Sequence, residues 1–279
     1  SLPYTVINGY LKYTDILSMG LNVNANNFGY SLQDFYPATS FPIATTRQFL
    51  TNAPATQYAN LEDYGTIGIF DPIGVNFIKI KYFDTAGVPF AVDNISKSTA
   101  NGAYDVFVSL NQFNVLYFGI FPGNLRGNIN SSLQTLINNG TIQGGSYTVE
   151  AFGANNTAIS KTYTINLNCP NTKGFEPIRL CWLNQWGAWD YYTFTMKSSK
   201  MISTKGSTYE QLEGTWNQET YRVNGFRGGK KSFRVNATEK ITMNTDFVSE
   251  NESVWFEELI NSPEVYQLDG FQTDTFTAF

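Results

Sequence analysis

The chain has 279 residues, of which 42% are hydrophobic and 16% aromatic, so it can fill more than one core and is not expected to be disordered. Its formal net charge is only −5, which argues against the diffuse attraction to phosphate that drives non-specific nucleic-acid binding. Histidine is absent from the sequence, so serine, cysteine and metal hydrolases of the usual kinds are excluded and no cofactor is expected.

Residues 1–65 are predicted to form an extended N-terminal arm. They are rich in proline and asparagine, and their aromatic residues follow neither the strand period of 2 nor the helix period of 3.6. Such a segment is buried against the following domain or a neighbouring subunit, and an irregular cap on its own domain is the alternative. The start lacks the regions of a signal peptide, and no run approaches the roughly 20 apolar residues of a membrane span, so neither Sec export nor membrane contact is expected.

Residues 66–170 are predicted to form an immunoglobulin-like β-sandwich. Alternating segments at 75–83, 104–110, 147–152 and 159–167 are separated by turns that contain glycine or asparagine, for example at 84–87. The hairpin formed by the last two segments resembles the closing strands of immunoglobulin-like modules. Within 131–140, a serine start, apolar spacing and a glycine stop predict a short helix.

Residues 175–279 are predicted to form a second β-sandwich with one flanking α-helix, after a linker at 169–174. The expected strands are 178–183, 189–197, 200–204, 229–235 and 240–243. Ser249 and Glu252 have capping-box spacing and Pro263 ends the pattern, which predicts a helix over 249–261. The fold class is therefore mainly all-β.

The chain has two cysteines, Cys169 and Cys181, too few for a disulfide scaffold or a four-cysteine zinc site. Both lie in apolar, strand-like surroundings, where cysteine behaves as a small hydrophobic residue. Free thiols are favoured for this reason, and a disulfide between the two is the alternative.

Residues 179–194 form the most distinctive segment, since six of these sixteen residues are aromatic. A sugar-binding platform is one interpretation, and a hairpin that fills a core and a subunit interface is the other. Strand alternation places Trp189 and Tyr191 opposite Tyr192 and Phe194, so both faces need cover, which favours the hairpin. The interface candidates in this segment are Trp182, Trp186, Trp189, Tyr191 and Tyr192.

Two blocks of opposite charge follow in the same predicted domain. The basic candidates are Arg222, Arg227, Lys230, Lys231 and Arg234. The acidic candidates are Glu250, Glu257 and Glu258. These blocks are either two solvated faces or a heterologous interface, in which the basic hairpin of one subunit meets the acidic helix of the next.

Little catalytic chemistry remains for this sequence. The segment 225–232 lacks the spacing of a phosphate-binding loop. A glycosidase-type carboxylate pair is the only other candidate, and no spacing selects a pair from Glu62, Asp63, Asp71, Asp190 and Glu258. We therefore do not expect an enzyme.

Residues 179–194 read RLCWLNQWGAWDYYTF and match the pattern RLxWLNxxGxWDYYxF. With the segments 195–198, 227–231, 235–237 and 255–266, they resemble a family of structural proteins from the virions of tailed bacteriophages, and 63–66 and 118–127 are similar to earlier signatures of that family. The resemblance implies a virion component assembled in the host cytoplasm, whose partners are other copies of itself and other virion proteins. Its expected place in the tail, baseplate or neck is an analogy, because the predicted sandwich with a helix looks like tail-tube and distal-tail ring subunits. A receptor- or glycan-binding adhesin module is the alternative function, with a glycan receptor as partner.

Overall fold

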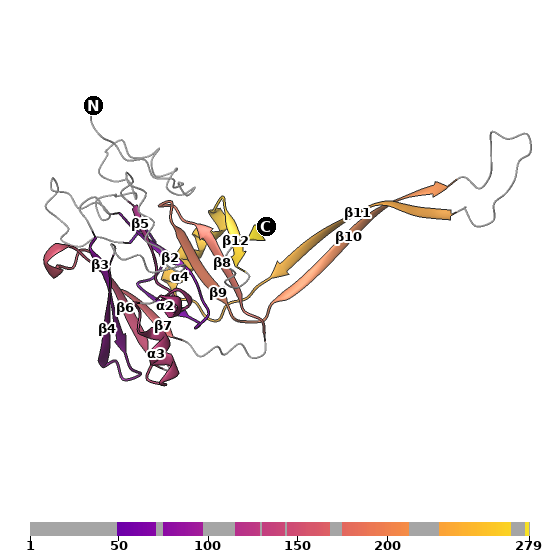
Figure 1. Ribbon diagram of the computed structural model, residues 1–279. Coiled ribbons are helices and arrows are strands. Elements are labelled where there is room, and N and C mark those ends of the chain that lie inside the picture. The colour runs from indigo at the N-terminus through magenta and orange to yellow at the C-terminus, as the bar shows by residue number, and fades with distance from the viewer. Residues whose placement is uncertain are drawn as a thin grey trace, which may run out of the picture.

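The computed structural model of the protein is mainly β-structured (Figure 1). The residues it describes are 49–70, 75–96, 115–128, 130–142, 144–167, 175–211, 229–268 and 277–278. Within these ranges the strands form four sheets.

The largest sheet has five strands in the order β1-β7-β6-β3-β4. Their bounds are Thr56–Ala59 (β1), Phe77–Phe83 (β3), Pro89–Ser96 (β4), Ser146–Phe152 (β6) and Tyr163–Leu167 (β7). Neighbouring strands are antiparallel except β1 and β7, which are parallel. Buried and more accessible residues alternate along β3, β6 and β7, so one face of this sheet supplies the core. The predicted hairpin of 147–152 and 159–167 is confirmed as the antiparallel pair β6 and β7.

The turn between β3 and β4 is formed by Asp84 and Gly87. The Asp84 carboxylate accepts hydrogen bonds from the backbone N–H groups of Ala86 and Val88 at 2.9 and 2.8 Å. Gly87 has a φ of 78°, a left-handed conformation that glycine adopts without a Cβ clash. The turn predicted at 84–87 is thus confirmed.

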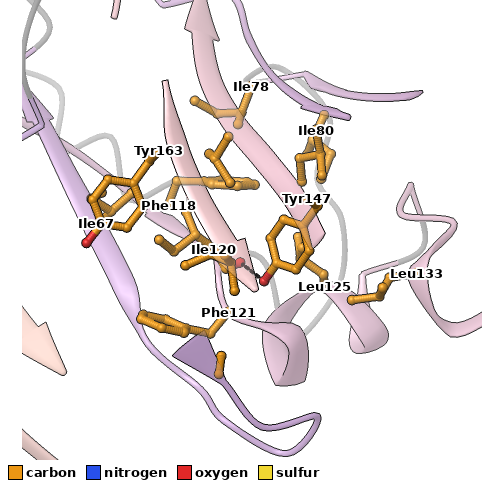
Figure 2. Close-up of a cluster of buried hydrophobic side chains, with 14 of the residues drawn as sticks. Ile67, Ile78, Ile80, Phe118, Ile120, Phe121, Leu125, Leu133, Tyr147 and Tyr163 are labelled. Atoms are coloured by element: carbon orange, nitrogen blue, oxygen red, sulfur yellow. Dashed lines mark hydrogen bonds between the residues drawn. The ribbon is translucent and has the colours of Figure 1, made fainter. Parts of the chain in front are cut away.

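A second sheet pairs Thr66–Phe70 (β2) with Val115–Gly119 (β5) in antiparallel register. Buried side chains of both sheets meet in one hydrophobic cluster, which includes Ile67, Ile69, Ile78, Ile80, Phe118 and Val149 (Figure 2). The buried Tyr147 hydroxyl donates to the Ile120 carbonyl oxygen at 2.7 Å, so its polar group is satisfied inside the core.

Among the described residues, three short helical segments lie between the strands of the first two sheets. Their bounds are Pro122–Gly127 (α2), Leu133–Asn138 (α3) and the 3-10 turn Ala154–Asn156 (η2). Leu125 of α2 and Leu133 of α3 are buried in the main cluster. The helix predicted within 131–140 is confirmed as α3.

The third sheet has the strand order β13-β12-β8-β9, and the helix α4, Glu250–Asn261, packs beside it. The strands are Ile178–Leu183 (β8), Trp189–Phe194 (β9), Val265–Leu268 (β12) and Thr277–Ala278 (β13). At the start of α4, the Ser249 hydroxyl accepts from the Glu252 N–H at 3.3 Å, and the Glu252 carboxylate accepts from the Ser249 N–H at 2.7 Å. The predicted capping box and helix are confirmed.

The fourth sheet is a two-stranded ribbon of Ser199–Gln211 (β10) and Gly229–Thr242 (β11). It runs out from the body of the molecule (Figure 1). The three short strands predicted at 200–204, 229–235 and 240–243 are parts of these two longer strands. They pair with each other, and almost all of their residues are exposed, so no described sheet packs on the ribbon as the second layer of a sandwich.

Residues 49–65, the last part of the predicted arm, belong to the body. Phe49 and Leu50 are buried, and β1 is an edge strand of the five-stranded sheet. The rest of the predicted arm, the strand predicted at 104–110 and the linker at 169–174 lie outside the described residues. The domain boundaries stay predictions, but contacts cross them, since Arg179 pairs with Asp63.

Candidate interaction site

The turn of the aromatic hairpin is organised by Asn184. Its side-chain oxygen accepts hydrogen bonds from the N–H groups of Trp186 and Ala188, both at 3.0 Å. Its side-chain nitrogen donates to the Leu50 carbonyl at 2.8 Å, and Gly187 supplies the positive φ of 76° that the turn requires. The tight turn and its attachment to the first described segment are therefore both encoded by this asparagine.

One face of the β8–β9 hairpin is covered by helix α4. The ring of Trp182 lies 5.0 Å from that of Trp255, and the ring of Tyr192 lies 4.7 Å from that of Phe256. Trp182 and Trp255 are 0% and 2% exposed. This cover comes from the same chain, so it needs no second subunit.

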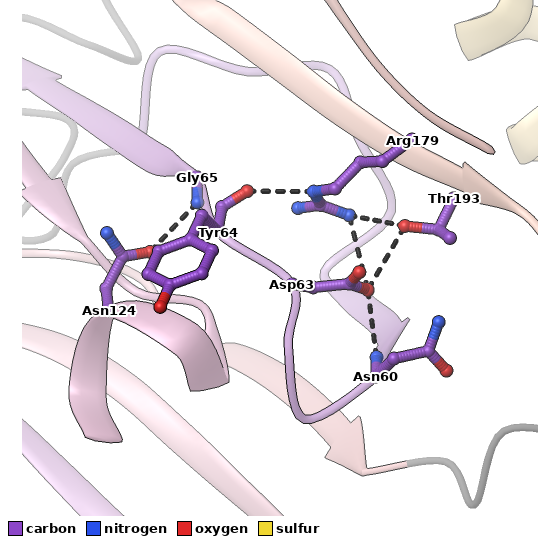
Figure 3. A network of polar contacts seen from close by, with 7 residues as sticks. All are labelled: Asn60, Asp63, Tyr64, Gly65, Asn124, Arg179 and Thr193. Carbon is purple, nitrogen blue, oxygen red and sulfur yellow. Dashed lines mark hydrogen bonds and ion pairs between the residues drawn. The ribbon is translucent and has the colours of Figure 1, made fainter. Parts of the chain in front are cut away.

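The opposite face of the hairpin packs on the β2–α2 region through Arg179 (Figure 3). The Arg179 guanidinium lies 4.5 Å from the ring of Phe121 and 3.3 Å from the Asp63 carboxylate, and it donates to the Tyr64 carbonyl at 2.8 Å. Thr193 accepts a further hydrogen bond from Arg179 at 2.6 Å and donates to Asp63 at 3.1 Å. Burial lowers the pKa of Arg179, and the Asp63 carboxylate opposes that shift. This network joins the β8–β9 hairpin to the segment before β2 and to the start of α2.

Two further carboxylates are buried where the hairpin, α4 and residues 51–52 meet. Asp190 accepts hydrogen bonds from Thr51 at 2.7 Å and from the Trp255 indole N–H at 2.7 Å. Glu258 accepts from the Asn52 side chain at 2.5 Å. Asp190 is 4% exposed and Glu258 is 0% exposed, so neither can reach a substrate.

The acidity of Asp190 makes stability depend on pH. Burial and the nearby Glu258 raise the pKa of Asp190 from 3.8 to about 7. Between these two values the native protein binds a proton that the unfolded chain does not, so the contribution of Asp190 to stability is complete below about pH 4 and is lost as the pH rises through about 7. We expect a loss on the order of 1–4 kcal/mol over this range.

This decline is measured by urea unfolding at about pH 4.5 and about pH 7.5. Asp190→Asn is expected to remove most of the difference between the two pH values, whereas the exposed Asp246→Asn leaves it in place. An unchanged pH dependence in Asp190→Asn would show that another group is responsible.

The structure corrects three of the interface candidates. Trp182, Trp186 and Glu258 are at most 5% exposed, because they fill the interior of their own chain. Trp186 is thereby also unable to stack on a sugar ring. Trp189 and Tyr191 are partly buried and have ring partners within the chain, at 5.6 Å in Tyr266 and 5.8 Å in Phe121.

The charged candidates lie elsewhere. Lys230, Lys231 and Arg234 are exposed on the ribbon, and Glu250 and Glu257 are exposed on α4. Arg222, Arg227 and Asp71 lie outside the described residues. Cys181 is buried with a free thiol, burial raises its pKa to about 11, and Cys169 is outside the described residues.

The ribbon has two chemically different faces, because residues paired across an antiparallel ladder share a face. The basic face carries Lys205, Lys231, Arg234 and Lys240, with Met201 and Tyr209 between them. The apolar face carries Ile202, Thr204, Gly206, Val235, Ala237 and Ile241. Ile202 and Val235 are 60% and 61% exposed. The ribbon therefore carries a group of apolar side chains on one face that no other described part of the chain covers.

A groove of about 700 Å³ lies where the ribbon joins the body. Its lining includes Tyr58, Tyr192, Asp246, Phe247, Glu252 and Trp255. The sequence did not indicate this groove, because its walls come from β1, β9 and the segment before α4, which are far apart along the chain. Phe247 is fully exposed at its edge.

No model of a known protein family matches this chain, and a search of curated proteins also finds no match. In the described part of the chain, no helix is long and apolar enough to cross a membrane. The same residues contain no group of three or more cysteine, aspartate or glutamate side chains that could hold a metal ion.

Proposed function

We propose that this chain is a non-catalytic structural component of a tailed-phage virion, and that it assembles through protein–protein contacts as a multimer or ring. The observation that carries the assembly role is the exposed ribbon. A two-stranded ribbon is marginally stable by itself in water, and exposed alternating hydrophobic residues gain free energy when a partner covers them. We therefore take the ribbon to be an arm that binds a neighbouring protein.

The virion is proposed from the resemblance of residues 179–194 and their companion segments to tailed-phage structural proteins. The tail, baseplate or neck is proposed by analogy, from the likeness of the predicted sandwich with a helix to tail-tube and distal-tail ring subunits. We also propose that the five-stranded sheet and the β2–β5 pair form an immunoglobulin-like sandwich. Their shared hydrophobic cluster supports this proposal. The partners are other copies of the chain and other virion proteins.

The assembly role is tested by shortening the ribbon. Thr204 and Ala237 are register partners, so joining them through an Asn-Gly turn removes the outer part of the ribbon and keeps its base. We expect the shortened chain to unfold at the same denaturant concentration as the full chain but to remain monomeric and absent from particles. Sedimentation velocity and incorporation into particles are the measurements.

A full-length chain that stays monomeric at high concentration and does not enter particles would refute the proposal. Equal multimerisation of the full-length and shortened chains would refute it as well. The unchanged unfolding midpoint separates loss of assembly from loss of the fold.

A further inference from the structure

The net charge of the ribbon lies on one of its faces. Its two strands contain six lysine or arginine residues and two glutamates, a formal charge of +4 in a chain whose total is −5. On the apolar face, Lys200 forms an ion pair with Glu239 at 2.5 Å, and Lys230 is the register partner of Glu210. The four cations without a glutamate on their face are Lys205, Lys231, Arg234 and Lys240.

The groove at the base of the ribbon has the complementary chemistry. None of the described residues that line it is a lysine or arginine, and Asp246 and Glu252 supply carboxylates. Glu250 adds a third carboxylate nearby, in the same first turn of α4 as Glu252. Tyr58 and Phe247 are 62% and 103% exposed there, so their ring faces are accessible. Carboxylates beside open aromatic rings suit lysine and arginine side chains, through charge-assisted hydrogen bonds and cation–π contacts.

The ribbon of the same chain does not occupy this groove. Thr195, Met196 and Asp246 of the lining flank the base of the ribbon, and the strands run outward from there (Figure 1). Thirteen residues of β10 extend roughly 43 Å at about 3.3 Å per residue, which is enough to reach an adjacent molecule.

We propose that the basic face of the ribbon docks in the acidic, aromatic groove of a second copy of this chain. This inference rests on the proposed assembly function and names the partner of the ribbon. Ribbon and groove are different surfaces, so the contact either repeats from copy to copy in a ring or filament, or is exchanged reciprocally between two copies in a two-fold dimer. Its electrostatic part is weakened by salt.

Charge reversal tests the contact. Lys205→Glu with Arg234→Glu is expected to raise the dissociation constant of self-association at least about tenfold, and adding Asp246→Lys is expected to recover part of the loss. Lys81→Glu with Lys161→Glu is the matched control, because both side chains are exposed on the body and the net charge changes equally. The control is expected to self-associate like the unmodified chain.

Cross-linking tests the pairing directly. A chain with Arg234→Cys is mixed with a chain with Asp246→Cys under mild oxidation, so a disulfide between these positions can form only between copies. We expect a peptide joining positions 234 and 246 by mass spectrometry, at a yield that falls with added salt. A Lys81→Cys chain in place of Arg234→Cys is expected to give no such peptide with position 246.

Two results would overturn the inference. If ribbon shortening abolishes assembly but charge reversal leaves it unchanged, the ribbon binds through another face or to another protein, and only the docking site is wrong. Glycan binding that Phe247→Ala abolishes without altering self-association would assign the groove to a sugar. Failure of the assembly function itself is recognised separately, because shortening the ribbon then has no effect.

Discussion

Replacing Arg179 with methionine is expected to lower the free energy of unfolding by about 3–5 kcal/mol, because it leaves the buried carboxylate of Asp63 without its counter-charge. The side chains of Arg179 and Asp63 are only 8% and 7% exposed, and their ion pair is 3.3 Å long. Without the guanidinium, the Asp63 carboxylate keeps hydrogen bonds from Asn60 and Thr193 but has no counter-charge. Urea unfolding measures the loss.

Two variants define what the Arg179→Met result means. The double change Arg179→Met with Asp63→Leu is expected to recover part of the stability, since removing both partners of a buried pair leaves no unpaired charge. Lys81→Met, which removes an exposed cation, is expected to change stability by less than about 0.5 kcal/mol. A loss below about 1 kcal/mol for Arg179→Met would mean that water reaches Asp63 in its place.

Replacing Trp255 with alanine is expected to destabilise the protein by about 3–5 kcal/mol, since it deletes a large buried side chain. Trp255 packs on Trp182 at 5.0 Å and donates its indole N–H to Asp190 at 2.7 Å. The substitution therefore opens a cavity under α4 and leaves an oxygen of Asp190 without its donor. Denaturant unfolding measures the loss of stability, and near-ultraviolet circular dichroism reports the change in aromatic packing.

The same helix supplies the control for Trp255→Ala. Val254 is 51% exposed, and Val254→Ala is expected to cost less than about 0.5 kcal/mol. Trp255→Phe keeps an aromatic ring but removes the donor, so it is expected to give an intermediate loss. If Trp255→Ala behaved like Val254→Ala, α4 would not be docked through this ring.

Local patterns predicted several elements, because their signals lie within a few residues of each other. The capping box of Ser249 and Glu252 located the start of α4, and alternation located β6, β8 and the start of β9. The ribbon was predicted as fragments, since both of its faces are exposed and the run around Asn236 and Glu239 has weak hydrophobic alternation.

The sites were harder to predict than the elements. Alternation along β9 showed that both faces of the hairpin need cover, but a periodic pattern does not identify the covering group. The cover is Trp255 on one side and Phe121 on the other, and neither is near β9 in sequence. From the sequence alone, Asp63 is only a candidate for a catalytic carboxylate pair. Its ion pair with Arg179 depends on contacts between segments that are distant in the sequence.

Hydrogen bonds that join Leu50, Thr51 and Asn52 to the rest of the body have a consequence for synthesis on the ribosome. Their partners are Asn184, Asp190 and Glu258, which lie 134, 139 and 206 positions further along the chain. Residues 50–52 therefore cannot complete these hydrogen bonds until the chain has been synthesised through Glu258. Such non-local pairing slows folding. Nascent chains that have not yet reached Glu258 are therefore expected to expose this segment to proteases and chaperones.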